Sequence, residues 1–192
     1  MLRSGGDPKP DCLPIARIGV SRVSRLLPLA ALALGSPLPA SSGFVAAASA
    51  APGWRGERWP GRLVTPAITL DQLIERHGEP IFAKIDVEGF EAEALAGLSR
   101  PLQAFSFEFT TILRQVAIDC LSRCQALGAY EYNAALGESQ RLAFTQWVDA
   151  ETIERWIEAL PDSANSGDIY ARLPTSALLV GSIRDRRRGL LR

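Results

Sequence analysis

The stretch Ile81-Phe82-Ala83-Lys84-Ile85-Asp86-Val87-Glu88-Gly89-Phe90-Glu91 decides the fold, because its side chains alternate in character and then reach a glycine. One face of a predicted strand over residues 81–87 carries the apolar side chains Ile81, Ala83, Ile85 and Val87. Gly89 predicts a tight turn, and the acidic and apolar residues after it predict a helix that begins near Glu91. The unit is therefore a strand, a tight turn and a helix.

The other face of this strand carries charged side chains toward its carboxyl end, where open α/β sheets bind ligands. Lys84, Asp86 and Glu88 lie there, and Glu108 falls near the end of the next predicted strand. A carboxylate at this edge can orient a substrate hydroxyl or take its proton, and Lys84 can keep carboxylates ionised or stabilise a developing alkoxide. These four are the candidate catalytic residues. The alternative, equally open from spacing, is that Lys84 and Asp86 form a buried charge pair and Glu88 belongs to the acidic start of the helix.

Strand and helix patterns also alternate on both sides of this stretch. Thr69 begins a capping box and predicts a helix that ends before Gly78. Further along, the patterns predict a strand over 104–109, an amphipathic helix over 112–127, two antiparallel strands over 130–135 and 141–144, and a helix capped by Asp149. This order predicts a layered α/β domain in which the strands of Lys84 and Phe107 are parallel neighbours, with a final antiparallel pair.

Several of these motifs together resemble the FkbM-type methyltransferase family. The matching residues are Thr69-Leu70-Asp71, the run from Lys84 to Glu91, Ser106-Phe107-Glu108-Phe109 and Asn165-Ser166-Gly167-Asp168, within about residues 44–173. The resemblance implies part of a class I methyltransferase sheet, which is Rossmann-like, with strands four to seven and their flanking helices. It also implies methyl transfer from S-adenosylmethionine to a hydroxyl oxygen of a small-molecule or glycan acceptor, such as a sugar or natural product. Asp86 and Glu88 would then face the reactive methyl group and the acceptor.

The cofactor half of that fold has no counterpart in the sequence. A glycine-rich loop after the first strand and an acid for the ribose hydroxyls are expected upstream of Lys84, and neither is found, so no residue is assigned to cofactor binding. Three hypotheses follow: an active O-methyltransferase; a truncated, inactive fragment that serves at most as an interaction module; and a secreted protein with another carboxylate-based activity. The missing half predicts negligible binding of S-adenosylmethionine. It also predicts an open edge at the Lys84 strand, unless the run from Leu26 to Leu34 pairs there.

Composition argues against nucleic acid, anionic membranes and metal ions as partners. The 192 residues are 47% hydrophobic and 22% charged, which is ordinary for one globular domain, and the formal net charge of zero gives no attraction to nucleic acid or anionic membranes. The three cysteines indicate a reduced, cytoplasmic protein, and with His77 as the one histidine they complete no metal site.

The two ends of the chain differ in composition from the middle. Residues 1–43 are rich in Arg, Pro, Ser, Leu and Ala, and are predicted to be disordered or non-native to the domain. The apolar run from Leu26 to Leu34 imitates a secretory signal but is too short to span a bilayer. Residues 174–192 are predicted to form a basic, solvated tail.

Overall fold

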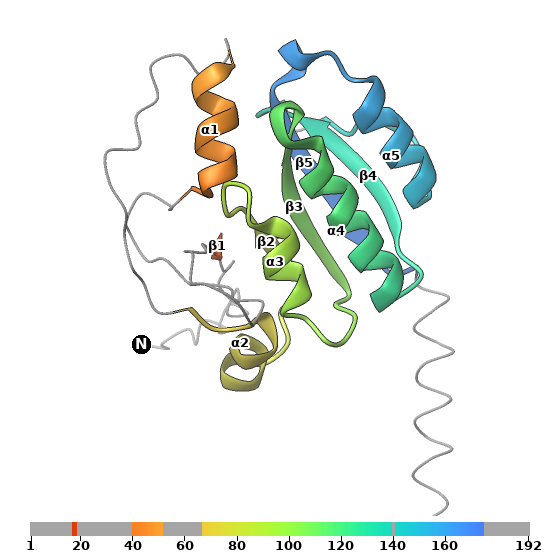
Figure 1. Ribbon diagram of the computed structural model, residues 1–192. Helices are drawn as coiled ribbons and strands as arrows, with labels where there is room; N and C mark the ends of the chain where they lie inside the picture. The colour runs from red at the N-terminus through yellow and green to blue at the C-terminus, as the bar shows by residue number, and fades with distance from the viewer. Residues whose placement is uncertain (1–16, 19–39, 52–66, 140, 175–192) are drawn as a thin grey trace, which may run out of the picture.

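The computed structural model describes residues 17–18, 40–51, 67–139 and 141–174, which form one mixed sheet with helices packed against it (Figure 1). The five strands are arranged in the order β1-β2-β3-β5-β4. Their bounds are β1 Arg17–Ile18, β2 Ala83–Ile85, β3 Ala104–Thr110, β4 Glu131–Leu136 and β5 Ser166–Arg172.

The parallel pairing of β2 and β3 confirms the central prediction from the sequence. Lys84 lies opposite Ser106 and Ile85 opposite Phe107. The last strand, β5, runs antiparallel to both neighbours and lies between β3 and β4. If β2 to β5 are numbered as strands four to seven, the order is 4-5-7-6, and the final antiparallel pair is β4 with β5. The α/β class and the partial Rossmann-like sheet are therefore confirmed.

The prediction of a second hairpin strand over residues 141–144 is wrong. Residues 141–144 form only an isolated bridge, between Leu142 and Ala135, and β4 pairs along its length with β5 instead. The side chain of Asn133 explains where the 141–144 segment goes, because its Oδ1 accepts a hydrogen bond from the Phe144 N–H at 3.1 Å and its Nδ2 donates one to the Phe144 carbonyl at 2.9 Å. A side chain of β4 therefore holds this segment in place of a continuous ladder.

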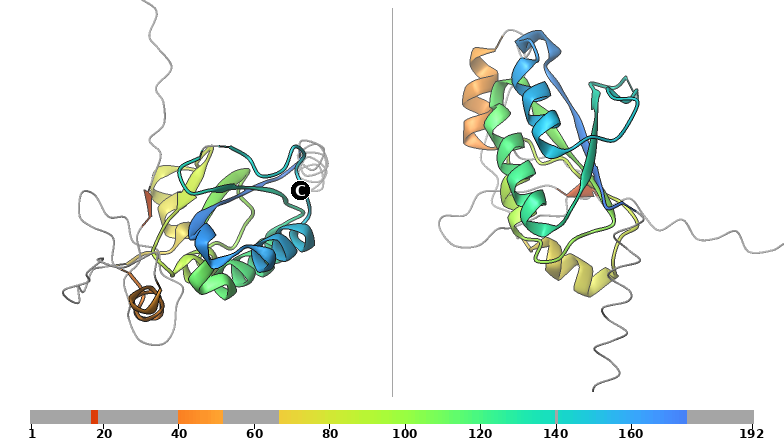
Figure 2. Two further views of the ribbon diagram at one scale, coloured as in Figure 1. Left: turned by 90° about the horizontal axis from the view of Figure 1, so that it is seen from above. Right: turned by 90° about the vertical axis from the view of Figure 1, so that its right-hand side faces the viewer.

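Helices cover one face of the sheet, with α4 and α5 running along it (Figure 2). The bounds are α1 Ser42–Ala50, α2 Leu70–His77, α3 Glu91–Ala96, α4 Arg114–Leu127 and α5 Ala150–Ala159, with 3-10 turns η2 Thr111–Leu113 and η3 Asp162–Ala164. Phe105, Phe107 and Ile169 are fully buried in the core on this side. The other face of β2 and β3 carries Lys84 and Glu108, so alternation along the strands separates core from polar side chains.

The predicted helix signals are confirmed with small shifts at the ends. Thr69 forms the full capping box with Gln72, and the Asp149 side chain accepts a hydrogen bond from Thr152 N–H at 2.8 Å at the start of α5. The long helix begins two residues later than predicted, because Thr111–Leu113 form a 3-10 turn. Cys120 and Cys124 are fully buried, as their helical spacing predicted.

The edge of β2 differs from its prediction in two ways. The strand is shorter than 81–87, and Ile81 is 75% exposed, although Ala83, Ile85 and Val87 are buried as predicted. Over two residues the edge is not open, since Arg17 lies opposite Lys84 and Ile18 opposite Ile85 in a parallel pair. The proposed partner at 26–34 and most of the segments 1–43 and 174–192 lie outside the described residues. No helix among the described residues is long and apolar enough to cross a bilayer.

Candidate active site

A tight turn between β2 and α3 presents the first two carboxylates. Asp86 follows the last residue of β2, and the chain then takes positive φ at two successive residues, +51° at Glu88 and +92° at Gly89. Glycine suits the second position because a Cβ there would lie 2.7 Å from Ser41 Oγ and 3.0 Å from the Cβ of Phe44. The turn therefore bends sharply under the start of α1, and the Ser41 N–H donates a hydrogen bond to the Glu88 carbonyl at 2.9 Å.

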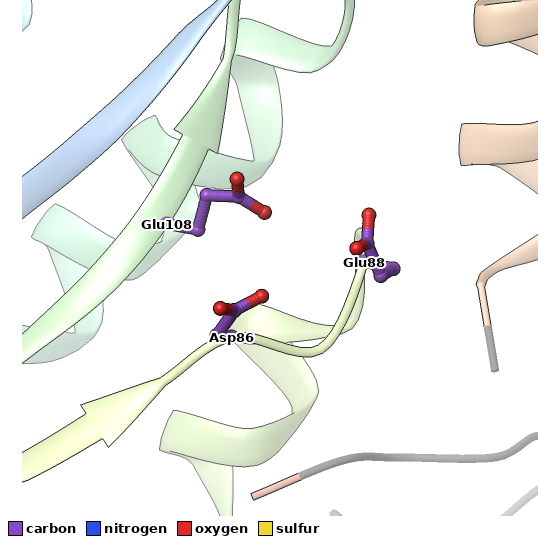
Figure 3. Close-up of side chains that lie close together, drawn as sticks. All are labelled: Asp86, Glu88 and Glu108. Atoms are coloured by element: carbon purple, nitrogen blue, oxygen red, sulfur yellow. The ribbon is translucent and has the colours of Figure 1, made fainter. Parts of the chain in front are cut away.

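Three of the four predicted site residues come together at this edge. Asp86, Glu88 and Glu108 each have a carboxylate oxygen within 4.8 Å of the other two (Figure 3). Glu108 reaches the cluster from β3, where it lies opposite Asp168 of β5. The parallel register of β2 and β3 places both strand ends at one edge, which is why residues 20 positions apart in sequence meet. Their catalytic roles stay predictions.

Glu108 holds a proton at neutral pH. Burial raises the pKa of its carboxyl from 4.5 to about 9, and the negative charges of Asp86 and Glu88 add to the effect, while Lys84 opposes it. Three carboxylates this close cannot all ionise cheaply, and burial makes Glu108 the one that stays neutral. At pH 7 the cluster therefore contains a carboxylic acid that can donate a hydrogen bond, beside carboxylates that can accept one.

Lys84 is bound more closely to Asp168 than to the cluster. Its Nζ donates to both Asp168 oxygens, at 2.8 and 2.9 Å, and lies 3.7 Å from Asp86 Oδ2. Burial opposes the charge, yet the hydrogen bond and charge of Asp168, with the charges of Asp86 and Glu108, raise the pKa of Lys84. The lysine is thus a cation fixed between β2 and β5, partly buried, that faces Asp86 from one side.

Two residues of this site were not singled out from the sequence. Asp168 anchors Lys84, and the signal for it was its place in the Asn165–Asp168 stretch of the family resemblance. Glu91 is buried, and its carboxylate accepts hydrogen bonds from the Val87 N–H at 3.0 Å and the Gly89 N–H at 3.1 Å. The sequence showed Glu91 as an acid in the first turn of a helix and as the last residue of the Lys84–Glu91 run that carries the family resemblance, without a role of its own.

The described residues do not complete a site for S-adenosylmethionine. Those ahead of β2 contain two glycines, Gly43 inside α1 and Gly78 after α2, and neither links a strand to a helix. A small pocket beside Glu108 and Glu91 has a cavity volume of about 10 Å³ and is lined further by Gly89, Phe109, Thr110, Leu113 and Val116. Pockets that hold drug-sized ligands usually have volumes of about 300–1,000 Å³, so this cavity is far too small for S-adenosylmethionine. The described part of the chain therefore supplies the carboxylates of a site, but no residues that would bind the nucleoside of the donor.

The same carboxylates are close enough together to share a cation, but their spacing alone does not identify a metal site, since exposed acidic groups often cluster without one. Cys120 and Cys124 are buried in α4 with free thiols, and burial raises the pKa of both. They lie in the apolar core and not at the sheet edge.

Comparison with known proteins agrees with the fold and the motifs. No curated protein and no solved structure matches the chain. The family model described as the methyltransferase FkbM domain matches residues 29–160, which includes α1 to α5, β2 to β4 and all three clustered carboxylates. A match over this much of the chain shows that it belongs to the FkbM methyltransferase family.

Proposed function

We propose that this protein is an O-methyltransferase that acts on a hydroxyl group of a small molecule or glycan, at the edge formed by Asp86, Glu88 and Glu108. The convergence of these three carboxylates at the ends of two parallel strands carries the proposal. Sugars and hydroxylated natural products present the donors and acceptors that such a cluster binds. The zero net charge supports a small acceptor over a nucleic acid.

The cluster offers two complementary groups to an acceptor hydroxyl. Glu108 is protonated at neutral pH and donates a hydrogen bond that orients the acceptor. Asp86 lies beside the Lys84 ammonium at the edge where the acceptor binds, and it is the base that takes the hydroxyl proton as the oxygen gains its methyl group. Lys84, held by Asp168, then stabilises the negative charge that develops on the acceptor oxygen. S-adenosylmethionine, the donor that the family implies, supplies the methyl group when bound.

The absence of a nucleoside site among the described residues favours a second function. In this alternative the chain is a catalytically inactive member of the family that serves as an interaction module and binds S-adenosylmethionine negligibly. The two functions share the fold and differ in whether the chain binds the donor. We further propose a cytoplasmic location, supported by the free thiols of Cys120 and Cys124.

Calorimetric titration of the full chain with S-adenosylmethionine separates the two functions. Saturable binding at one site per chain supports the enzyme, and its absence under conditions where the chain is folded supports the interaction module. Glu93→Gln is a suitable control for the loss of a carboxylate, because Glu93 is exposed and lies outside the cluster. A secreted protein with another activity would instead be recognised by a shortened mature N-terminus in mass spectrometry.

A further inference from the structure

Glu91 has an environment unlike that of an ordinary acid at the start of a helix. It is 3% exposed, whereas Glu93 in the same turn of α3 is exposed. Burial raises the pKa of Glu91 to about 7, and the charge of Glu88 raises it further, while hydrogen bonds from backbone N–H groups lower it. Burying a carboxylate is costly, so the hydrogen bonds that it makes are the feature to explain.

The Glu91 carboxylate accepts hydrogen bonds from the turn that carries the site. Glu91 Oε1 accepts from the Val87 N–H at 3.0 Å and from the Gly89 N–H at 3.2 Å, and Oε2 accepts from the same Gly89 N–H at 3.1 Å. These two amides flank Glu88 on either side. One side chain therefore fixes the backbone before and after the residue that enters the cluster.

The same turn is held from its opposite side and has an uncommon conformation. Glu88 has a φ of +51°, which a residue with a side chain adopts only at a cost in energy, and its carbonyl accepts the Ser41 N–H at 2.9 Å. Glu91, through the amides, and Ser41, through a carbonyl, thus both support the strained turn. The result is that the Glu88 carboxylate lies within 4.8 Å of the carboxyl groups of Asp86 and Glu108.

We infer that Glu91 is a positioning residue, whose buried carboxylate binds the amides of Val87 and Gly89 and thereby holds Glu88 against Glu108. The role of the cluster in methyl transfer rests on the proposed function, but the geometric role of Glu91 does not. Glu91 itself need not touch the acceptor. Its effect passes through the backbone of the turn.

A double-mutant cycle tests this inference without any substrate. The side-chain carboxyl of Glu108, labelled with carbon-13, is titrated by NMR. In the wild-type background Glu88→Gln should lower the pKa of Glu108 by about one unit, because a nearby like charge is removed. In the Glu91→Gln background the same change should lower it by less than half as much, because Glu88 is no longer held close. In a Glu93→Gln background the full effect should remain.

The double-mutant cycle separates the effect of Glu91 on the position of Glu88 from the effect of the Glu91 charge on Glu108. The charge of Glu91 also raises the pKa of Glu108, but a loss of charge alone would leave the effect of Glu88→Gln unchanged. An equal effect in the wild-type and Glu91→Gln backgrounds would overturn the inference.

A measurement on the wild-type chain keeps the test valid if Glu91→Gln does not fold. Scalar couplings through the hydrogen bonds, from the Val87 and Gly89 amide nitrogens to the carboxylate carbon of Glu91, should be detectable, and the absence of both would refute the inference. Neither measurement involves S-adenosylmethionine. A failure of the proposed function in calorimetry is therefore distinguishable from a failure here.

Discussion

Replacing Glu108 by glutamine should make the protein more stable at neutral and alkaline pH. The folded state holds Glu108 protonated with a pKa of about 9, whereas the unfolded chain ionises it near 4.5. Between these values the folded state binds more protons than the unfolded state, so the free energy of unfolding falls as the pH rises. Glutamine resembles the protonated acid in shape and does not titrate, and the variant therefore loses this dependence.

The size of the effect follows from the same two values. Each unit of pKa difference is worth about 1.4 kcal/mol, so at pH 7, about 2.5 units above 4.5, Glu108 lowers the free energy of unfolding by roughly 3 kcal/mol relative to acid conditions. The loss continues until the pH passes about 9 and would then reach roughly 6 kcal/mol. A typical domain is stable by about 5–15 kcal/mol, so the difference should be easy to measure.

Urea unfolding of the wild type and Glu108→Gln at pH 5, 6, 7 and 8 is the assay. The difference in free energy of unfolding, variant minus wild type, should grow by roughly 4 kcal/mol across this range, because the slope is about 1.4 kcal/mol per pH unit. Glu93→Gln, which removes an exposed carboxylate outside the cluster, is measured beside it as the control. A constant difference for Glu108→Gln would refute the claim that this carboxyl is neutral in the fold.

Two further predictions concern the turn and the helix core. In urea unfolding, Gly89→Ala should lower the free energy of unfolding by about 1–3 kcal/mol more than Gly137→Ala does. Both glycines have positive φ, but only at Gly89 would the new Cβ meet a neighbour, Ser41 Oγ at 2.7 Å. Equal losses would show that the turn is not closely packed. Cys120 and Cys124 should resist a thiol reagent in the native protein and react on unfolding, because both thiols are buried and have raised pKa values. Rapid labelling of either cysteine in the native protein, located by peptide mass, would contradict the packing of α4.

The sequence was sufficient to predict the parts of the fold where pattern and packing agree. The alternation from Ala83 to Val87 predicted one buried face correctly, and the capping box of Thr69 and the cap of Asp149 marked two helix starts. The three clustered carboxylates were also predictable, because residues at the carboxyl ends of parallel strands share an edge of the sheet.

Other features depend on contacts between distant residues and leave little trace in a local pattern. The core-facing residues of β5 are Gly167, Ile169 and Ala171, two of them small, so the strand has a weak apolar signal. Gly167 is required because a Cβ there would lie 2.2 Å from the Ala135 carbonyl oxygen, which only the pairing with β4 reveals. By its place in the first turn of the helix Glu91 looks like the exposed Glu93, and its burial becomes visible only once the turn is folded against it.

Transfer of a labelled methyl group from S-adenosylmethionine tests the central claim most directly. The wild-type chain, Asp86→Asn and Glu93→Gln would be incubated with the labelled donor and a panel of hydroxyl-bearing sugars and natural products, and product label would be counted. We predict transfer to at least one acceptor by the wild type and by Glu93→Gln, and a loss of about 100-fold or more in Asp86→Asn, since a positioned base contributes about 10²–10⁴-fold. Circular dichroism would confirm that all three proteins are folded. Equal transfer by Asp86→Asn and the wild type, or no transfer by the folded wild type to any acceptor, would contradict the account.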